Sequence, residues 1–207
     1  MAPAEPRPRF DVDVGVIEGF FGKTWSWEER AAYAGFLRDL GFSFYIYTPK
    51  DDRFLRQRWR DPWPAETVAK TSALSRAYRD MGLSFGLGFS PFELHLDPQP
   101  EDAAALRAKV AQLNEADPDI LCIQFDDMRG AAPDLADQQM ATIDEICSAS
   151  TASRFIACPT YYSFDPALER VFGAMPENYL TDLGRLLDPA IDVFWTGPEV
   201  CSRRYPA

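Results

Sequence analysis

The chain has 207 residues, of which 46% are hydrophobic and 26% are charged, and its formal net charge is -11. This composition is typical of a globular protein with enough apolar material for one sizeable core. The negative charge argues against nucleic acid or an anionic membrane surface as a partner, because both bind through basic patches.

The first ten residues are polar and rich in proline, and they contain no apolar run that would form the core of a signal peptide. We expect a disordered lead over residues 1–10 and a single domain over residues 11–207. Beyond the lead, short apolar runs alternate with longer amphipathic segments. The apolar runs are Val12–Gly19, Phe42–Tyr47, Leu83–Phe89, Ile120–Phe125, Arg154–Cys158 and Ile191–Trp195. Most of them are nearly continuous, which predicts strands covered on both faces, as in a parallel sheet.

The amphipathic segments predict helices. The first opens with a capping box, in which Ser26 is the cap and Glu29 lies three positions on, and it ends at Gly41. The apolar stripe expected on it consists of Ala32, Phe36, Leu37 and Leu40. The other helices are expected over Glu66–Met81 (ending at Gly82), Asp102–Asn114, Leu135–Ser148 and Glu177–Leu187.

Strand starts recur about every 30 to 40 residues, which is the length of one β/α unit. An eight-unit barrel typically needs about 250 residues. We therefore predict an α/β fold of the TIM (β/α)8 type in which only about six of the eight units are present. An open, doubly wound sheet is the alternative, although Gly19-Phe-Phe-Gly22 lacks the Gly-rich dinucleotide fingerprint.

Functional groups of a parallel barrel gather where strands end. The strand ends are Glu18 to Gly22, Pro49 to Asp52, Ser90 to Glu93, Phe125 to Asp127, Cys158 to Tyr162 and Trp195 to Pro198. Carboxylates, a lysine and aromatic rings in one pocket suit a neutral polyhydroxylated ligand, because rings stack on sugar faces and polar tips bind hydroxyls. Several of these residues also have structural interpretations: Asp51 and Asp52 as helix-start charges, Gly19 and Gly22 as turn glycines, and Lys50 as a surface lysine. We expect one of Tyr161 and Tyr162 to pack and the other to face the pocket, and we expect packing roles for Trp25, Trp27, Trp59 and Trp63.

Asp126 and Asp127 are the strongest candidates for catalysis. Two carboxyl groups this close do not both ionise freely, which favours a general acid, while a helix N-cap pair is the structural alternative. Neighbours at one strand end are poorly placed to attack a sugar ring from opposite sides. They suit substrate-assisted hydrolysis, in which the 2-acetamido oxygen of the sugar is the nucleophile.

The four cysteines are irregularly spaced and form no CxxC pair, and His95 is the only histidine. A Cys/His metal site is therefore not expected. The chain has no run of about 18 apolar residues that would span a membrane. With no signal peptide and no disulfide pattern, a reducing cytoplasm is the expected location.

Five motifs together resemble a known family. They are Gly15-Val-Ile-Glu-Gly-Phe-Phe-Gly22, Tyr47-Thr-Pro-Lys-Asp-Asp52, Phe125-Asp-Asp127, Cys158-Pro-Thr160 with Tyr162, and Trp195-Thr-Gly-Pro198. In their order, and over roughly residues 12 to 200, they resemble the catalytic domain of glycoside hydrolase family 84. That family comprises β-N-acetylglucosaminidases, including the O-GlcNAcases and enzymes once called hyaluronidases. Each motif alone is weak, and the set is highly specific.

The resemblance implies a retaining exo-β-N-acetylglucosaminidase that acts on O-GlcNAc-modified protein or GlcNAc-terminated glycans through an oxazoline. Asp126 would orient and polarise the acetamido group, and Asp127 would be the general acid and then the base. Gly19 (through its backbone) and Lys50 would bind sugar hydroxyls. Tyr162 would support the acetamido group and Thr196 would lie at its pocket. The resemblance implies no metal or organic cofactor.

The chain departs from the family pattern at three places. Phe21 stands where an aromatic hydroxyl is common, a change expected to affect packing more than chemistry, and Lys23-Thr24-Trp25 replaces Arg-Pro-Trp. Family members also continue past Trp-Thr-Gly-Pro into further pocket segments, whereas this sequence stops at Ala207. We therefore expect weak turnover and self-association through open barrel edges. The alternatives are a non-catalytic sugar-binding or remnant barrel, and a hydrolase with an ordinary carboxylate pair such as Glu18 with Asp127.

Overall fold

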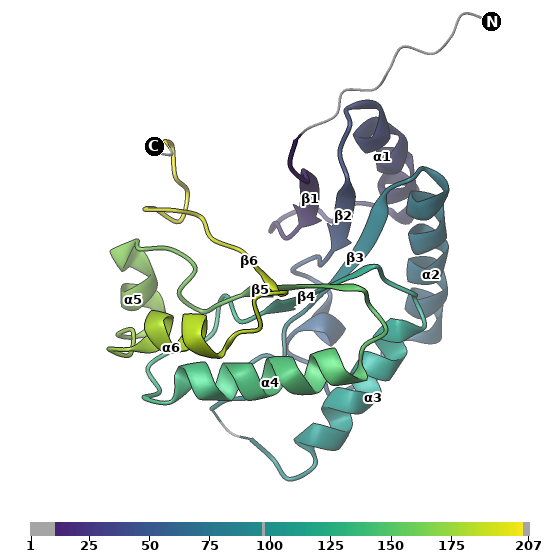
Figure 1. Ribbon diagram of the computed structural model, residues 1–207. Coiled ribbons are helices and arrows are strands. Elements are labelled where there is room, and N and C mark those ends of the chain that lie inside the picture. The colour runs from purple at the N-terminus through teal and green to yellow at the C-terminus, as the bar shows by residue number, and fades with distance from the viewer. Residues whose placement is uncertain (1–10, 97, 205–207) are drawn as a thin grey trace, which may run out of the picture.

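The computed structural model describes residues 11–96 and 98–204 as one parallel sheet flanked by helices (Figure 1), and the lead expected over residues 1–10 lies outside this range. The strands are β1 (Gly15–Glu18), β2 (Phe44–Tyr47), β3 (Ser84–Phe89), β4 (Ile120–Gln124), β5 (Arg154–Cys158) and β6 (Asp192–Val193). Each strand pairs in parallel with the next along the chain, so the sheet order is β1-β2-β3-β4-β5-β6. A doubly wound sheet reverses its strand order at a switch point. The sequential order excludes that alternative and confirms the partial barrel.

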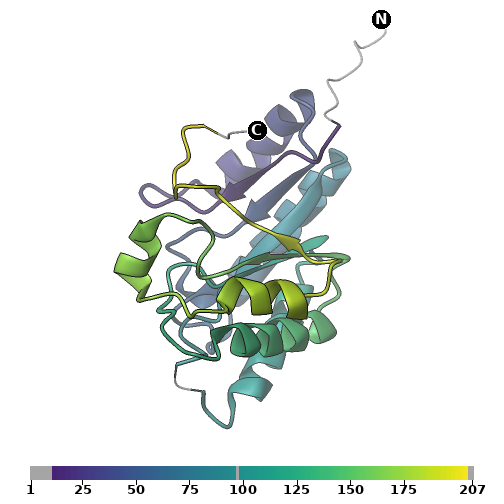
Figure 2. The same cartoon turned by 60° about the vertical axis from the view of Figure 1, so that its left-hand side comes forward.

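Helices follow the strands. They are α1 (Trp27–Asp39), η1 (Arg53–Leu55), α2 (Ala65–Asp80), α3 (Asp102–Asn114), α4 (Leu135–Ala149), α5 (Pro166–Phe172) and α6 (Tyr179–Leu186). Figures 1 and 2 show α1 to α4 ranged along one side of the curved sheet, with α6 beside α4. No helix among the described residues is long and apolar enough to cross a membrane.

The two faces of the sheet bury different residues because side chains alternate along each strand. The helix-facing side carries large side chains such as Tyr45, Phe85 and Leu121, which belong to the main core cluster. The inner side carries a smaller cluster that consists of Phe44, Ile46, Ile120, Cys122 and Ile156. The central strands β2, β3 and β4 are therefore almost fully buried on both faces, as their continuous apolar runs predict.

Gly88 of β3 leaves room for side chains from β2 and β4 to meet inside the barrel. A Cβ atom at Gly88 would lie 2.3 Å from Cβ of Thr48. Without that atom, the buried Thr48 hydroxyl donates a hydrogen bond of 2.8 Å to Oε1 of Gln124, across β3. This contact ties the end of β2 to the end of β4, where the site residues follow.

The helix boundaries follow from local chemistry. At the start of α1, the Glu29 amide donates to Ser26 Oγ at 3.1 Å, and the Ser26 amide donates to Glu29 Oε2 at 2.6 Å, so the predicted capping box is confirmed. Gly41 and Gly82 end α1 and α2 with φ values of 80° and 75°, the left-handed conformation that favours glycine.

Three sequence expectations need correction. The apolar stripe of α1 was wrong at three of its four residues, because Ala32, Phe36 and Leu40 are exposed; Leu37 is buried as expected, together with Ala34. Helix α5 was not expected; Asp165 caps it by accepting a bond of 2.8 Å from the Ala167 amide, and Pro166 supplies a preset φ. The last predicted strand shortens to the exposed residues of β6.

Candidate active site

The loops after β2 and β4 meet at a lysine and two aspartates. Nζ of Lys50 lies 2.7 Å from Oδ2 of Asp126 and 3.0 Å from Oδ2 of Asp127. The carboxyl ends of parallel strands lie at one edge of the sheet, so residues 76 and 77 positions apart come together there. Lys50 and Asp126 are largely buried, and Asp127 is about one-third exposed at 35%. The structure therefore brings together three of the predicted site residues.

Arg56 adds a second cation to this cluster. Its Nη2 lies 3.5 Å from Oδ2 of Asp127, and the arginine is buried. Two cations thus face two carboxylates, which offsets the repulsion between the adjacent aspartates. Arg56 was not among the predicted site residues, because it is one of four arginines from Arg53 to Arg60 and no pattern distinguishes it.

The two aspartates differ in backbone conformation and in the hydrogen bonds that their oxygens form. Asp127 has a φ of 62°, a left-handed conformation that is uncommon for residues other than glycine and is found at functional sites. Oδ1 of Asp126 is buried and has no hydrogen-bond partner among the described residues. A buried carboxylate oxygen without a donor is costly. A ligand N–H that reached Asp126 would remove that cost.

Tyr162 and Thr196 lie on the β5 and β6 side of the site. Burial, followed by the charges of Asp127 and Asp126, raises the pKa of Tyr162 to about 12. Its hydroxyl therefore keeps its proton at neutral pH and is a hydrogen-bond donor. The Thr196 amide donates to the Tyr162 carbonyl at 3.0 Å, and the Thr196 hydroxyl donates to the Glu199 carbonyl at 3.0 Å. The neighbouring Tyr161 is buried, and its hydroxyl donates to the Gly173 carbonyl. Tyr161 is therefore the packing member of the two tyrosines, as expected for one of them.

The loop after β1 forms one wall beside Lys50. A cavity of about 90 Å³ is lined by Glu18, Phe20, Phe21, Gly22, Thr24, Pro49, Lys50 and Asp51. Gly19 lies between two of these residues at the end of β1. Phe21 is 77% exposed, and Nζ of Lys50 lies 5.9 Å from the centre of its ring. The ring of Phe21 is therefore exposed beside the site lysine and is not part of the core.

Asp52 has a structural position. It accepts hydrogen bonds from the Phe54 amide at 3.0 Å, which caps η1, and from Nε1 of Trp63 at 2.9 Å. Burial raises its pKa. Trp59 and Trp63 are buried, which confirms the packing roles expected for these two. The helix-start interpretation therefore holds for Asp52.

Glu18 points away from the aspartates. Its carboxylate accepts bonds of 2.8 Å and 2.6 Å from Arg30 and a further bond from the Tyr45 hydroxyl, and all three residues are buried. In the sheet register Glu18 lies beside Tyr47, a member of the helix-facing core. An ordinary catalytic pair of Glu18 with Asp127 is therefore incompatible with this structure.

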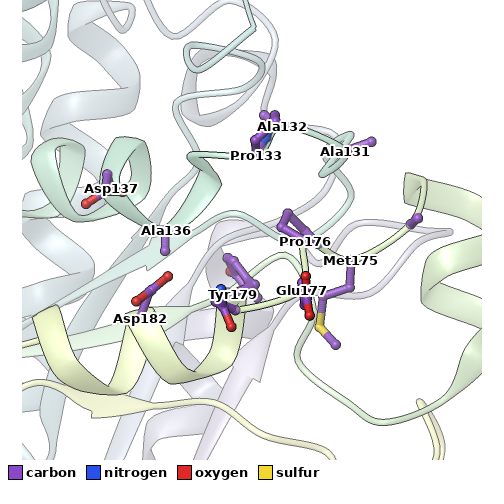
Figure 3. Close-up of a pocket in the computed structure, with 12 residues that line it drawn as sticks. Ala131, Ala132, Pro133, Ala136, Asp137, Met175, Pro176, Glu177, Tyr179 and Asp182 are labelled. Carbon is purple, nitrogen blue, oxygen red and sulfur yellow. The ribbon is translucent and has the colours of Figure 1, made fainter.

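A larger pocket of about 450 Å³ lies near the start of α6 (Figure 3). Its walls include Pro133, Met175 and Tyr179, and the acidic residues Asp137 and Asp182. None of the predicted site residues lines it. Across residues 11–96 and 98–204, no group of three or more His, Cys, Asp or Glu side chains is arranged to hold a metal ion.

Comparison with known proteins places the chain among enzymes of one family. The family described as beta-N-acetylglucosaminidase matches residues 14–206. The chain is 28% identical over 201 residues to the Protein O-GlcNAcase of Mus musculus and to that of Rattus norvegicus. The match covers 93% of this chain and 22% of each relative, so the chain spans about a fifth of their length.

Two solved structures have the same fold. A mutant of the O-GlcNAc hydrolase of Thermobaculum terrenum has 30% identity and a TM-score of 0.75, over 92% of this chain and 42% of that one. The structure of CpGH84B has 25% identity and a TM-score of 0.77, over 91% of this chain and 34% of that one. With a family match over nearly its whole length, the chain belongs to the β-N-acetylglucosaminidases of glycoside hydrolase family 84.

Proposed function

We propose that this chain forms the catalytic centre of a retaining exo-β-N-acetylglucosaminidase. Its substrates would be O-GlcNAc-modified proteins or GlcNAc-terminated glycans. The observation that carries the proposal is the pair of adjacent carboxylates, Asp126 and Asp127, both bound to the ammonium group of Lys50 at one strand end. Both acids follow one strand, which suits a reaction in which the substrate itself supplies the nucleophile.

In the first step, the carbonyl oxygen of the 2-acetamido group attacks the anomeric carbon as the glycosidic bond breaks. Asp127 donates its proton to the leaving oxygen, and its partial exposure suits a group that meets both aglycone and water. Asp126 accepts the acetamido N–H through Oδ1, the buried oxygen that has no other partner among the described residues. The products of this step are the protonated oxazoline (an oxazolinium ion), whose N–H stays hydrogen-bonded to Asp126, and the free aglycone.

In the second step, Asp127 removes a proton from water, which attacks the anomeric carbon and opens the oxazoline. The configuration is retained because two inversions have occurred. The Tyr162 hydroxyl, which stays protonated, donates to the acetamido oxygen, and Thr196 fixes the Tyr162 backbone at the edge of that pocket. Lys50 and the backbone of Gly19 bind sugar hydroxyls beside the cavity that follows β1.

The test is release of an aryl group from aryl β-N-acetylglucosaminides across pH. The proteins are this chain, the same chain completed to eight β/α units, and the completed chain with Asp126→Asn or Asp127→Asn. We expect the completed chain to turn over and each variant to lose about 10²- to 10⁴-fold in kcat, which is the usual contribution of acid–base catalysis.

A binding assay separates catalysis from sugar binding. GlcNAc-thiazoline, a mimic of the oxazoline, should bind far more tightly than GlcNAc if the acetamido group takes part in the reaction. A completed chain that binds GlcNAc and releases no aryl group would instead support a non-catalytic sugar-binding barrel. Equal affinity for thiazoline and GlcNAc in an active enzyme would overturn the substrate-assisted mechanism.

A further inference from the structure

Arg56 is a buried cation at the edge of the site. It is 5% exposed, and Asp127 is its sole carboxylate partner within the described residues, at 3.5 Å between Nη2 and Oδ2. A buried guanidinium is retained only where a carboxylate or other acceptors compensate its lost hydration. The carboxylate of Asp127 therefore compensates part of the hydration that the buried Arg56 guanidinium has lost.

The backbone holds Arg56 at this place. The Arg56 amide donates to the Arg53 carbonyl at 3.1 Å and closes η1. The preceding residue, Leu55, accepts a bond of 2.9 Å from the amide of Ser90, the first residue after β3. The guanidinium carbon also lies 5.9 Å from the centre of the Phe92 ring. The arginine is thus anchored to the β3 end, between the strands that carry Lys50 and Asp127.

Arg56 also has an unused donor. Nη1 is buried and has no hydrogen-bond partner among residues 11–96 and 98–204. A guanidinium that holds one oxygen of a carboxyl group leaves the other oxygen free to carry the proton that a general acid donates. The carboxyl group of Asp127 is the one that Nη2 of Arg56 faces, at 3.5 Å from Oδ2.

Lys50 contacts both aspartates, whereas Arg56 contacts Asp127 alone within the described residues. Nζ of Lys50 contacts both aspartates, and under the proposed function it also binds sugar hydroxyls. Arg56 contacts Asp127 and not Asp126, so its charge is the one committed to Asp127 alone within the described residues. We propose that Arg56 is a positioning residue that holds the general acid Asp127 in line with the leaving oxygen. This inference rests on the proposed function and adds a residue to its acid–base step.

The test measures kcat and KM of the active, completed chain against aryl β-N-acetylglucosaminides with phenols of decreasing acidity. Poor leaving groups need the proton from Asp127, and very good ones need it little. We expect Arg56→Gln to lower kcat/KM by roughly 10- to 100-fold for the poorest phenol, within the range of acid catalysis, and by less than about threefold for a dinitrophenol. Arg56→Lys keeps the charge and should recover part of the loss.

Two controls distinguish positioning from a general structural effect. Arg58→Gln removes an exposed arginine of the same segment, paired with Asp61, and should leave all substrates unchanged. GlcNAc-thiazoline has no leaving group that needs a proton. The affinity of Arg56→Gln for it should therefore be within about threefold of the parent's affinity, because Arg56 is not proposed to contact the sugar. If Arg56→Gln does not fold, Arg56→Lys alone must show the leaving-group dependence.

The outcomes separate the two proposals. An inert completed chain overturns the proposed function and this inference with it. An active parent whose Arg56 variants lose the same factor on every phenol, or lose nothing, overturns the inference alone. A loss that grows as the phenol becomes less acidic, with thiazoline binding kept, supports Arg56 as the residue that positions Asp127.

Discussion

Replacing Glu18 by Gln removes the charge partner of Arg30 while keeping the shape of the side chain. Glu18 and Arg30 are 1% and 3% exposed, and they form two hydrogen bonds of 2.6 Å and 2.8 Å. Breaking a buried pair by removing one partner costs about 3–5 kcal/mol, because the other charge stays buried without compensation. For a domain of this size that corresponds to a fall in Tm of roughly 6–20 °C.

The assay is urea unfolding followed by tryptophan fluorescence, with Glu66→Gln as the matched control. Glu66 pairs with Lys70 on the exposed face of α2 at 2.7 Å, and exposed pairs of this kind contribute little to stability. We expect no measurable change for the control. A Glu18→Gln protein as stable as the parent would refute the argument that this pair is buried and structural. A Glu18→Gln protein of full stability that lost acid–base catalysis would return Glu18 to the active site.

Three further predictions concern pH, packing and association. Burial lowers the pKa of Lys109 from 10.5 to about 8, so the folded state binds fewer protons than the unfolded state between these values, and the free energy of unfolding should rise with pH across that window. Lys109→Met should remove this rise in urea titrations at pH 7 to 9.5, and an identical pH slope in the two proteins would contradict the assignment. Gly88→Val places a side chain against Thr48 and should cost about 1–3 kcal/mol or more in urea unfolding, whereas unchanged stability would mean that the interior there is not close-packed. Within the described residues β1 and β6 are the edge strands of the sheet, and such edges should make this protein self-associate in analytical ultracentrifugation, whereas a monodisperse monomer would contradict this.

The fold could be predicted because its signals are local. Continuous apolar runs marked all six strands to within three residues at each end, and the capping box at Ser26 and the glycines at 41 and 82 marked helix ends. The buried face of α1 was predicted wrongly because successive helix residues lie about 100° apart, so a small rotation of the helix about its axis buries different side chains. Packing against the sheet, not the helix sequence alone, decides which side chains are buried. Trp27 and Arg30 pack on Tyr47 of the sheet, whereas Phe36 is exposed.

The site was predictable only in part. Lys50, Asp126 and Asp127 follow strands directly, so the rule that parallel strands end at one edge was enough to expect them together. Arg56 lies six residues beyond Lys50, and its direction depends on the turn of η1 and on the bond between Leu55 and Ser90. No periodicity in the sequence encodes such a turn. Long-range contacts of this kind appear only once the chain is folded.

The site residues divide between a rigid part and an exposed part of the sheet. Lys50, Arg56 and the two aspartates follow or adjoin β2, β3 and β4, whose residues are buried almost throughout. Thr196 follows β6, whose residues are exposed, and its amide holds the backbone of Tyr162. Perturbing β6 should therefore disturb the groups proposed to hold the acetamido oxygen while the acid–base pair keeps its geometry. A loss of turnover caused there would be a loss of the internal nucleophile, and it should affect good and poor leaving groups alike, unlike a change at Arg56.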